Sequence, residues 1–195
     1  MNERGKFIVL YGANNLGKST QVGMLADAIT DHGFGVEELK YPIYNLEPTG
    51  PQINAVLRQG VKIKELELQK IYAQNRFDYQ SILEKTLKSG RWVIAEDYNG
   101  TGAAWGIVRG ISLKKLEGLN KGLIKEDLAI LLYGERFTGG IEKNHRNETD
   151  DRIWDLSQIV HLDLAEKYGW RKVYATRSAE KVHNEILKIV KENFL

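Results

Sequence analysis

Residues 7–19 decide the fold of this chain, and they read Phe7-Ile8-Val9-Leu10-Tyr11-Gly12-Ala13-Asn14-Asn15-Leu16-Gly17-Lys18-Ser19. An apolar run is followed by the pattern G-x-x-x-x-G-K-S/T, which carries meaning when a strand precedes it and a helix follows. The glycines allow backbone N–H groups to curl around phosphate oxygens, and the positive end of the next helix points at them. A purely structural turn is the alternative. Eight matching positions at a strand end favour a nucleoside triphosphate site.

Each part of this loop has an expected role. We expect Lys18 to reach the β- and γ-phosphates of ATP, and the Ser19 hydroxyl to ligate Mg²⁺. The residues expected to surround the nucleotide are Gly12, Ala13, Asn14, Asn15, Leu16, Gly17, Lys18, Ser19 and Thr20. A second apolar run ends in Glu96 and Asp97, whose carboxylates are expected to hold Mg²⁺ directly or through water. A solvated acidic turn is the alternative for that pair.

The composition narrows the class of protein further. The chain has 195 residues, of which 42% are apolar and 28% charged, so we expect one domain over 1–195 with a real core. No apolar run approaches the roughly 20 residues of a membrane span, and the polar residues 1–6 predict no signal peptide. The absence of cysteine suits a cytoplasmic protein. A net charge of +2 gives no argument for nucleic acid as a partner.

Short apolar runs alternate with longer amphipathic stretches, which is the pattern of an α/β fold with a parallel sheet. We expect strands at 7–11, 36–41, 92–96, 128–133 and 172–175. We expect helices at 18–31, 52–58, 64–89, 101–108, 151–168 and 179–192. These elements predict the three-layer sandwich of P-loop NTPases, with helices on both faces of five strands. The loops after the strands should then converge at one edge of the sheet.

A phosphate-binding loop alone does not separate GTPases, ATPase motors and small-molecule kinases. The Asn-Lys-x-Asp segment with which GTPases read guanine is missing from the sequence. The segment 135–152 carries Arg136, Lys143, His145, Arg146 and Arg152. A kinase needs a mobile basic lid of this kind, which closes over the phosphates, excludes water and stabilises the transferring charge. A charge-rich surface loop is the alternative.

Several blocks of the chain, in order and spacing, resemble the thymidylate kinase family. The opening strand, phosphate loop and first helix do so, as does Tyr72-Ala73-Gln74-Asn75-Arg76. The stretch Glu96-Asp97-Tyr98-Asn99-Gly100-Thr101-Gly102-Ala103-Ala104-Trp105 is similar to the family's Asp-Arg-Tyr strand end and the Ser-Gly-x-Ala-aromatic segment after it. Asp151-Arg152-Ile153 resembles the end of the family's lid. The resemblance implies transfer of the γ-phosphoryl group of ATP to dTMP by a homodimer, paired through the helices at 64–89 and 101–108.

The resemblance also implies a role for individual residues. Tyr72 would stack on the base, and Arg76, one helical turn later, would hold the phosphate or the base edge. Core packing is the alternative for Tyr72, and a surface salt bridge is the alternative for Arg76. The other residues that would contact the acceptor nucleotide are Tyr44, Asn75, Tyr98, Thr101 and Gly102. The resemblance adds Arg136 and Arg177 to the ATP site, and it implies catalytic roles for Lys18, Arg76, Glu96, Asp97, Arg146 and Arg152.

The chain departs from the family pattern at three places. Asp97 replaces the arginine of Asp-Arg-Tyr, no arginine follows the second strand, and Asn14-Asn15 replaces the acid and, in some members, the arginine of the phosphate loop. A charge-assisted contact to phosphate contributes roughly 1.5–3 kcal/mol, so lid arginines, Arg109 or Lys40 would have to compensate. Two alternatives stay open. A deoxynucleoside kinase would use Glu47 or the Glu96–Asp97 pair as the base, and a nucleotide-binding protein would have lost catalysis.

Overall fold

The computed structural model describes residues 3–195 as a five-stranded parallel sheet between two layers of helices. The strand order is β2-β3-β1-β4-β5, so β1, which leads into the phosphate loop, lies in the centre. The strands are β1 Phe7–Tyr11, β2 Val36–Lys40, β3 Trp92–Glu96, β4 Leu128–Tyr133 and β5 Arg171–Tyr174. The helices are α1 Lys18–Asp31, α2 Thr49–Arg58, α3 Glu65–Lys88, α4 Asn99–Val108, α5 Leu113–Leu119, α6 Asp151–Tyr168 and α7 Ala179–Phe194, with a short 3₁₀ helix η1 at Thr138–Gly140.

The sequence predictions of fold class, strands and main helices are confirmed, with shifted ends. Helix α2 begins at Thr49, three residues before the predicted start, and Pro51 lies in its first turn, where a missing N–H costs nothing. Helix α4 likewise begins two residues earlier than predicted, at Asn99. The prediction missed α5, whose seven residues are too few to show a helical period.

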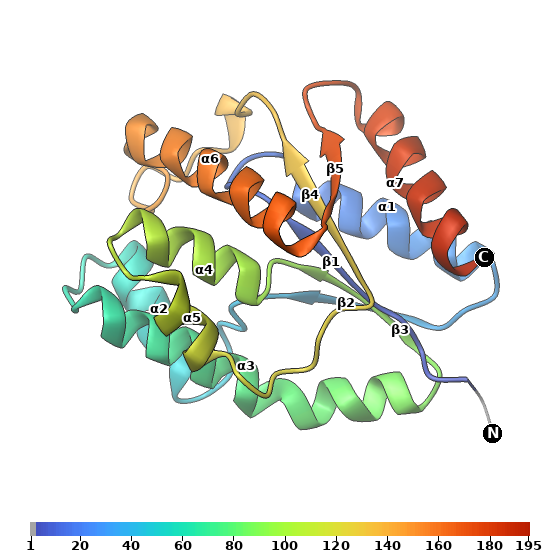
Figure 1. Cartoon of the computed structure of the whole chain (residues 1–195), viewed down its shortest axis with the longest axis horizontal. Helices are drawn as coiled ribbons and strands as arrows, with labels where there is room; N and C mark the ends of the chain where they lie inside the picture. The colour runs from blue at the N-terminus through green and yellow to red at the C-terminus, as the bar shows by residue number, and fades with distance from the viewer. Residues whose placement is uncertain (1–2) are drawn as a thin grey trace.

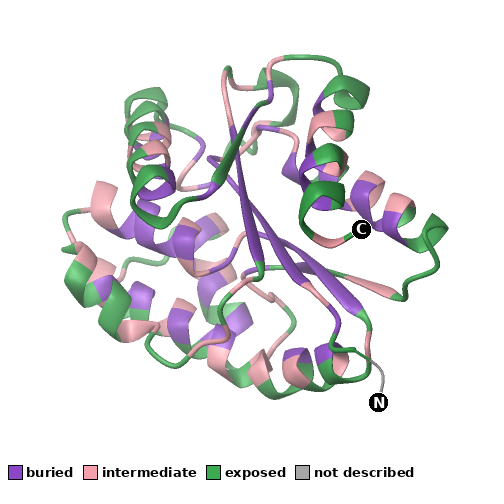
Figure 2. Cartoon of the chain, turned by 45° about the vertical axis from the view of Figure 1, so that its right-hand side comes forward, coloured by how far each residue is buried: buried purple, intermediate pink, exposed green. Residues whose placement is uncertain are grey.

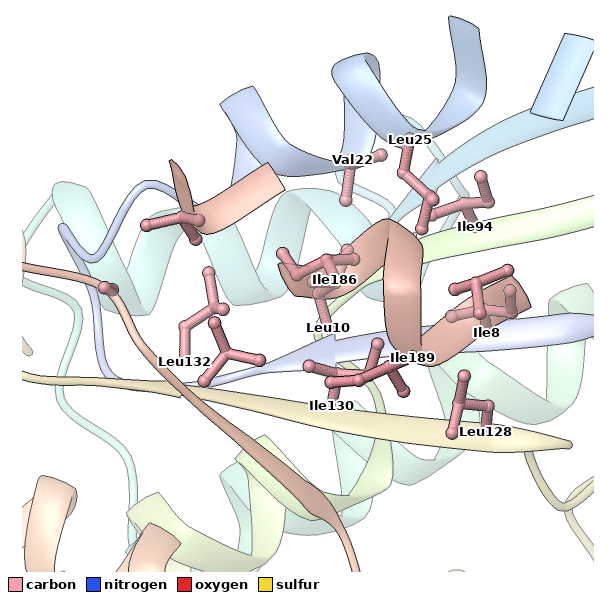
Figure 3. Close-up of a cluster of buried hydrophobic side chains, with 14 of the residues drawn as sticks. Ile8, Leu10, Val22, Leu25, Ile94, Leu128, Ile130, Leu132, Ile186 and Ile189 are labelled. Atoms are coloured by element: carbon pink, nitrogen blue, oxygen red, sulfur yellow. The ribbon is translucent and has the colours of Figure 1, made fainter. Parts of the chain in front are cut away.

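Alternate residues of the central strand point into two separate cores. Ile8 and Leu10 pack with residues of α1 and α7, including Leu25 and Ile186, and Figure 3 shows this cluster around Leu10 and Ile130. The side chains of the opposite face pack with α3, α4, α5 and α6. Figure 1 shows the same division, with α1 and α7 on one side of the sheet and the other helices across it. In Figure 2 the inner strands are buried along most of their length, as expected when helices cover both faces.

The strand register places three polar segments side by side at the carboxyl edge of the sheet. Leu10 pairs with Glu96 across β1 and β3, and Lys40 pairs with Glu96 across β2 and β3. The backbone N–H of Asp97 donates to the carbonyl of Leu10 at 3.0 Å. The acidic end of β3 therefore lies directly beside the start of the phosphate loop, with the end of β2 on its other side.

Among residues 3–195, no helix is both long enough and apolar enough to cross a bilayer.

Candidate active site

A cavity of about 340 Å³ opens at this edge of the sheet. Its lining joins the phosphate loop, the ends of β2 and β3, helices α2, α3 and α4, and the segment after β4. The lining residues are Asn14, Asn15, Gly17, Lys18, Ser19, Thr20, Lys40, Tyr41, Pro42, Tyr44, Leu57, Arg58, Tyr72, Arg76, Glu96, Asp97, Tyr98, Thr101, Gly102, Trp105, Phe137, Gly140, Glu142, His145, Asn147 and Glu148. The cavity therefore brings most of the residues predicted from the sequence to one place.

The phosphate loop wraps around the Lys18 ammonium group. Gly17 adopts the left-handed conformation (φ 81°), which turns the chain sharply into α1. Lys18 is 4% exposed, and its Nζ donates to the carbonyls of Gly12 (3.0 Å) and Ala13 (2.8 Å). The same Nζ lies 3.7 Å from Oδ1 of Asp97. The ammonium is thus fixed at the mouth of the loop, where an incoming phosphate can compete for its hydrogen bonds.

Glu96 joins the ends of three elements. Its Oε2 accepts a hydrogen bond of 2.5 Å from Oγ of Ser19, and its Oε1 lies 3.0 Å from Nζ of Lys40. Burial raises the pKa of Glu96, but Lys18, Lys40 and the Ser19 hydrogen bond outweigh burial and leave that pKa below its usual value. Glu96 is therefore ionised at neutral pH.

Asp97 behaves differently from its neighbour. Burial raises its pKa, and Glu96 adds to the rise, so that the pKa of Asp97 reaches about 6 despite the nearby Lys18. Its Oδ1 accepts a hydrogen bond of 2.7 Å from Oγ1 of Thr101. The pKa values of these adjacent carboxylates are thus shifted in opposite directions. At Glu96 the cations and the Ser19 hydroxyl outweigh burial, whereas at Asp97 burial and the charge of Glu96 outweigh the cations.

These oxygen atoms fit Mg²⁺. Ser19, Glu96 and Asp97 offer one hydroxyl and two carboxylates, the hard oxygen ligands that this ion prefers. Within residues 3–195 there is no cluster of three or more His, Cys, Asp or Glu side chains that would hold a metal alone. Mg²⁺ bound with a nucleotide needs no such cluster, because phosphates and water complete its shell.

Arg76 on α3 forms the other end of the cavity. The residue is 4% exposed, and its guanidinium donates to the carbonyl of Tyr98 and to Oδ1 of Asn120, both at 3.0 Å. Its Nε has no hydrogen-bond partner among residues 3–195. No carboxylate within residues 3–195 forms an ion pair with it, and burial lowers its pKa. A buried cation with no counter-charge is costly unless an anion binds beside it.

Two neighbours shape the space around Arg76. Tyr72 lies one turn earlier on α3, with the Arg76 guanidinium 6.0 Å from the centre of its ring. Gly102 on α4 leaves room for the guanidinium, since a Cβ at that position would lie 2.6 Å from Nη2 of Arg76. Thr101 and Tyr44 also line the cavity, and Tyr44 lies beneath the Arg58 guanidinium at 4.7 Å.

Two residues predicted to touch the acceptor lie deeper than expected. Asn75 is fully buried and does not line the cavity. Its amide binds both the N–H and the carbonyl of Ile43 and the Thr49 hydroxyl, so it fixes the segment between β2 and α2. Tyr98 is 1% exposed and packs edge-on against Phe7, which makes its ring part of the cavity floor.

The lid segment, defined as residues 135–150, lines one side of the cavity. Arg58 on α2 pairs with Glu142 at 2.7 and 3.1 Å, and the N–H of Arg146 donates to the carbonyl of Leu57 at 2.9 Å. On the opposite side, the N–H of Phe137 donates to the carbonyl of Asn15 at 2.9 Å. The lid segment therefore bridges the phosphate loop and α2.

Apart from Arg76, the arginines predicted to contact ATP or the transferring phosphate lie outside the cavity lining. Arg136 pairs with Asp151 at 3.0 Å, and Arg146 pairs with Glu65 at 2.8 Å. Arg177 binds the carbonyl of Tyr174 and Glu185, at the start of α7. Arg152 lies in the first turn of α6. Their predicted contacts with nucleotide stay predictions, since each would need to leave its present partner or position.

The sequence did not single out several lining residues. Phe137 and Arg58 carry no motif, and long-range packing alone brings them to the cavity. Glu148 is the least expected, because a single acid in a charge-rich loop gives no signal of burial, yet it is 6% exposed. Glu47, which an alternative reaction would have used as a base, is exposed and not among the lining residues, so it is wrongly placed for that role.

The central phosphate loop, the acidic end of β3 and the opposed cationic end define a P-loop kinase of small phosphorylated acceptors. The profile of the family described as "Thymidylate kinase" matches residues 10–186. The chain belongs to the thymidylate kinase family, whose members are nucleoside monophosphate kinases that use ATP with Mg²⁺. The family prediction made from the sequence is confirmed.

Individual relatives agree along nearly the whole chain. A protein named "Thymidylate kinase" from Plasmodium falciparum is 29% identical over 96% of this chain and 90% of its own length. A "Probable thymidylate kinase" from Pyrococcus horikoshii is 30% identical over 98% of both. The solved structure of thymidylate kinase from Candida albicans superposes with a TM-score of 0.82 at 20% identity, covering 99% of this chain and 94% of that one, which confirms the fold.

Proposed function

We propose that this chain transfers the γ-phosphoryl group of ATP to dTMP, which yields ADP and dTDP. The observation that carries the proposal is a single cavity with two unlike ends. One end holds Lys18 in the phosphate loop, and the other holds Arg76, a buried cation that forms no ion pair with a carboxylate within residues 3–195. The first end fits a triphosphate and the second fits the phosphate of an acceptor.

The donor end acts by position and charge. Lys18 leaves the carbonyls of Gly12 and Ala13 and binds the β- and γ-phosphate oxygens. Mg²⁺, held by Ser19 with Glu96 and Asp97, supplies neutralisation of the phosphate charge when it is bound. Lys40, which pairs with Glu96, adds a second cation at the same end.

The acceptor end sets the direction of attack. Arg76 holds the acceptor phosphate, and Tyr72 lies beside it to stack on the base. One oxygen of that phosphate forms a bond to the γ-phosphorus, while the bond between the γ-phosphorus and the β–γ bridging oxygen breaks and ADP leaves. The attacking oxygen is already anionic, so the reaction needs no strong base.

The structure offers a substitute for the arginine that the family places after its second strand. Arg58 at the end of α2 lies over the Tyr44 ring and lines the cavity. It now pairs with Glu142 of the lid segment, so an acceptor phosphate would exchange one anionic partner for another. Arg109, by contrast, donates to the carbonyl of Arg146 and does not line the cavity.

The experiment that tests the proposal incubates the purified protein with Mg–ATP and, separately, thymidine, dTMP, dUMP, dCMP and dGMP, and resolves the products. We expect dTDP from dTMP, and no product in the Lys18→Ala variant purified in the same way, which controls for a contaminating kinase. Product from thymidine alone would instead identify a nucleoside kinase. Binding of ATP without any product would identify a binding protein.

We also infer that the chain forms a homodimer in the cytoplasm. The interface that the resemblance implies, through the helices at 64–89 and 101–108, stays a prediction, and α4 within it has no fully exposed residue. Helix α6 instead exposes Leu156 (48%) and Ile159 (55%), one turn apart. Sedimentation of the Leu156→Glu and Ile159→Glu variants tests this interface, and a dimer that persists in both would exclude it.

Cell fractionation tests the cytoplasmic location.

A further inference from the structure

We infer that Glu148 is a positioning residue, whose buried carboxylate latches the lid segment onto Asn14 and Asn15 of the phosphate loop. This inference rests on the proposed kinase function for its consequence in turnover. The latch itself rests on geometry alone.

The carboxylate of Glu148 is shared between the two asparagines. Its Oε1 accepts from Nδ2 of Asn14 at 2.7 Å, and its Oε2 accepts from Nδ2 of Asn15 at 2.8 Å. The N–H of Glu142 donates to the same Oε2 at 2.9 Å. One buried acid therefore ties together the phosphate loop and two turns of the lid segment.

Among residues 3–195, no lysine or arginine side chain forms an ion pair with this carboxylate. Nδ1 of His145 lies 3.8 Å away and accepts a hydrogen bond from the N–H of Asn147, and burial lowers the pKa of His145, which favours its neutral form. Burial raises the pKa of Glu148, but the donors from Asn14, Glu142 and Asn15 outweigh it and leave the pKa low. The buried charge thus depends on the amide groups of the phosphate loop.

Further contacts join the lid segment and helix α6 to the phosphate loop at the same two asparagines. The indole N–H of Trp154 donates to the carbonyl of Asn14 at 2.8 Å, and the N–H of Phe137 donates to that of Asn15 at 2.9 Å. A Cβ at Gly140 would lie 3.2 Å from Oδ1 of Asn15. Both asparagines are held through side chain and backbone, so their amides have one orientation toward Glu148.

This geometry explains the unusual asparagines of the loop. An acid at position 14 would face the carboxylate of Glu148 and repel it, whereas an amide donates to it. In this chain the carboxylate of the interaction therefore lies on the lid segment, and the amides lie on the phosphate loop. Closure then depends on a pair of residues that must match each other.

The test is a swap of the two partners. Asn14→Asp sets two carboxylates against each other, and Glu148→Gln removes the charge that accepts both amides. The double variant Asn14→Asp with Glu148→Gln restores one amide facing one carboxylate, with the roles exchanged. Glu135→Gln is the matched control, since that lid carboxylate is exposed and forms no ion pair within residues 3–195.

The first measurement is the rate of tryptic cleavage after Lys143, an exposed residue in the lid segment. Proteases cut extended chain, so the rate reports how often the lid segment is released. Loss of a hydrogen bond to a charged group shifts such an equilibrium by a factor of roughly 10 to 100. We expect cleavage at least about 10-fold faster in each single variant, and within about threefold of wild type in the swap and in Glu135→Gln.

The second measurement separates positioning from simple loss of structure. We expect kcat for dTDP formation to fall at least about 10-fold in Glu148→Gln while the Kd for Mg–ADP stays within about threefold. ADP released by hydrolysis should rise relative to dTDP, because an open lid admits water. Single variants cleaved at the wild-type rate, or a swap without rescue, would overturn the latch. If the wild type forms no dTDP, the proposed function fails, and the cleavage rates still decide the latch.

Discussion

The two ends of the cavity handle charge in opposite ways. At the donor end each cation has a carboxylate within reach: Lys18 lies 3.7 Å from Asp97, and Lys40 lies 3.0 Å from Glu96. At the acceptor end Arg76 is as buried as Lys18, but within residues 3–195 its hydrogen bonds go to a backbone carbonyl and the Asn120 amide, and it pairs with no carboxylate. The donor end is balanced before any ligand arrives, whereas the acceptor end is not.

The difference reflects what each end receives. A metal–triphosphate complex brings both signs of charge, so a site with both signs can exchange its internal pairs for contacts with the ligand. A monophosphate brings only negative charge, so an unneutralised cation favours it strongly and a neutral nucleoside weakly. The difference in charge between the two ends thus favours Mg–ATP at the donor end and the monophosphate at the acceptor end.

The largest expected effect comes from removing the donor cation. Lys18→Ala leaves Asp97 without its counter-charge and takes away the group that follows the transferring phosphate. We expect kcat to fall by at least about 100-fold for every acceptor that is turned over, because the lost contact acts on the charge of the transition state. Steady-state assays with dTMP and dUMP check this. A loss confined to one acceptor would show that Lys18 serves the other end.

Removing the acceptor cation should give a different signature. Arg76→Met keeps the volume of the side chain but removes its charge, so kcat/KM for dTMP should fall about 10- to 100-fold. The free energy of unfolding should not fall, because an unpaired buried charge has been taken out. Urea titration and kinetics measure both quantities. A destabilised variant would mean that Arg76 is chiefly structural.

A pH profile sharpens the contrast between the two carboxylates of the donor end. The pKa of Asp97 is raised from 3.8 to about 6, so its negative charge is lost as the pH falls through 6, while Glu96 stays ionised. We expect kcat/KM for Mg–ATP to fall roughly tenfold between pH 7 and pH 5. Asp97→Asn, which tolerates the same left-handed backbone (φ 63°), should flatten this limb. An unchanged limb would assign it to another group.

The smallest expected effect probes the space around the acceptor cation. A methyl group at Gly102 would lie 2.6 Å from Nη2 of Arg76, so Gly102→Ala must displace the guanidinium. We expect KM for dTMP to rise roughly 3- to 10-fold with little change in the KM for ATP. Gly118→Ala on α5 is the matched control, since a Cβ there meets no atom within 4 Å. Equal effects in both variants would contradict the explanation.

The sequence predicted the donor end well, because that end is built from contiguous residues. The strand, glycine loop and helix of residues 7–31 are local, and Glu96–Asp97 follows a buried apolar run. Because β1 and β3 pair in parallel with Leu10 opposite Glu96, these two segments lie side by side. Tyr72 and Arg76 were predictable as a pair because they are one helical turn apart.

The acceptor end and the lid segment were less predictable, because their partners are distant in the chain. Asn75 lies next to Arg76 on the same helix, yet it does not line the cavity. Its side chain instead forms hydrogen bonds with Ile43 and Thr49. Arg146 is a lid arginine, yet it pairs with Glu65 on α3. Neither outcome follows from residue type, since the same side chains at the same spacing would fit a phosphate equally well.

By itself the sequence determined the three-layer fold, the central phosphate loop and the family, because local apolar patterns and one eight-residue motif specify them. Only the tertiary structure decided which cations remain without a counter-charge and where a single acid such as Glu148 goes. The physical reason is that charge balance in a cavity is a sum over elements far apart in the chain, and their approach is set by packing of the two cores on either side of the sheet.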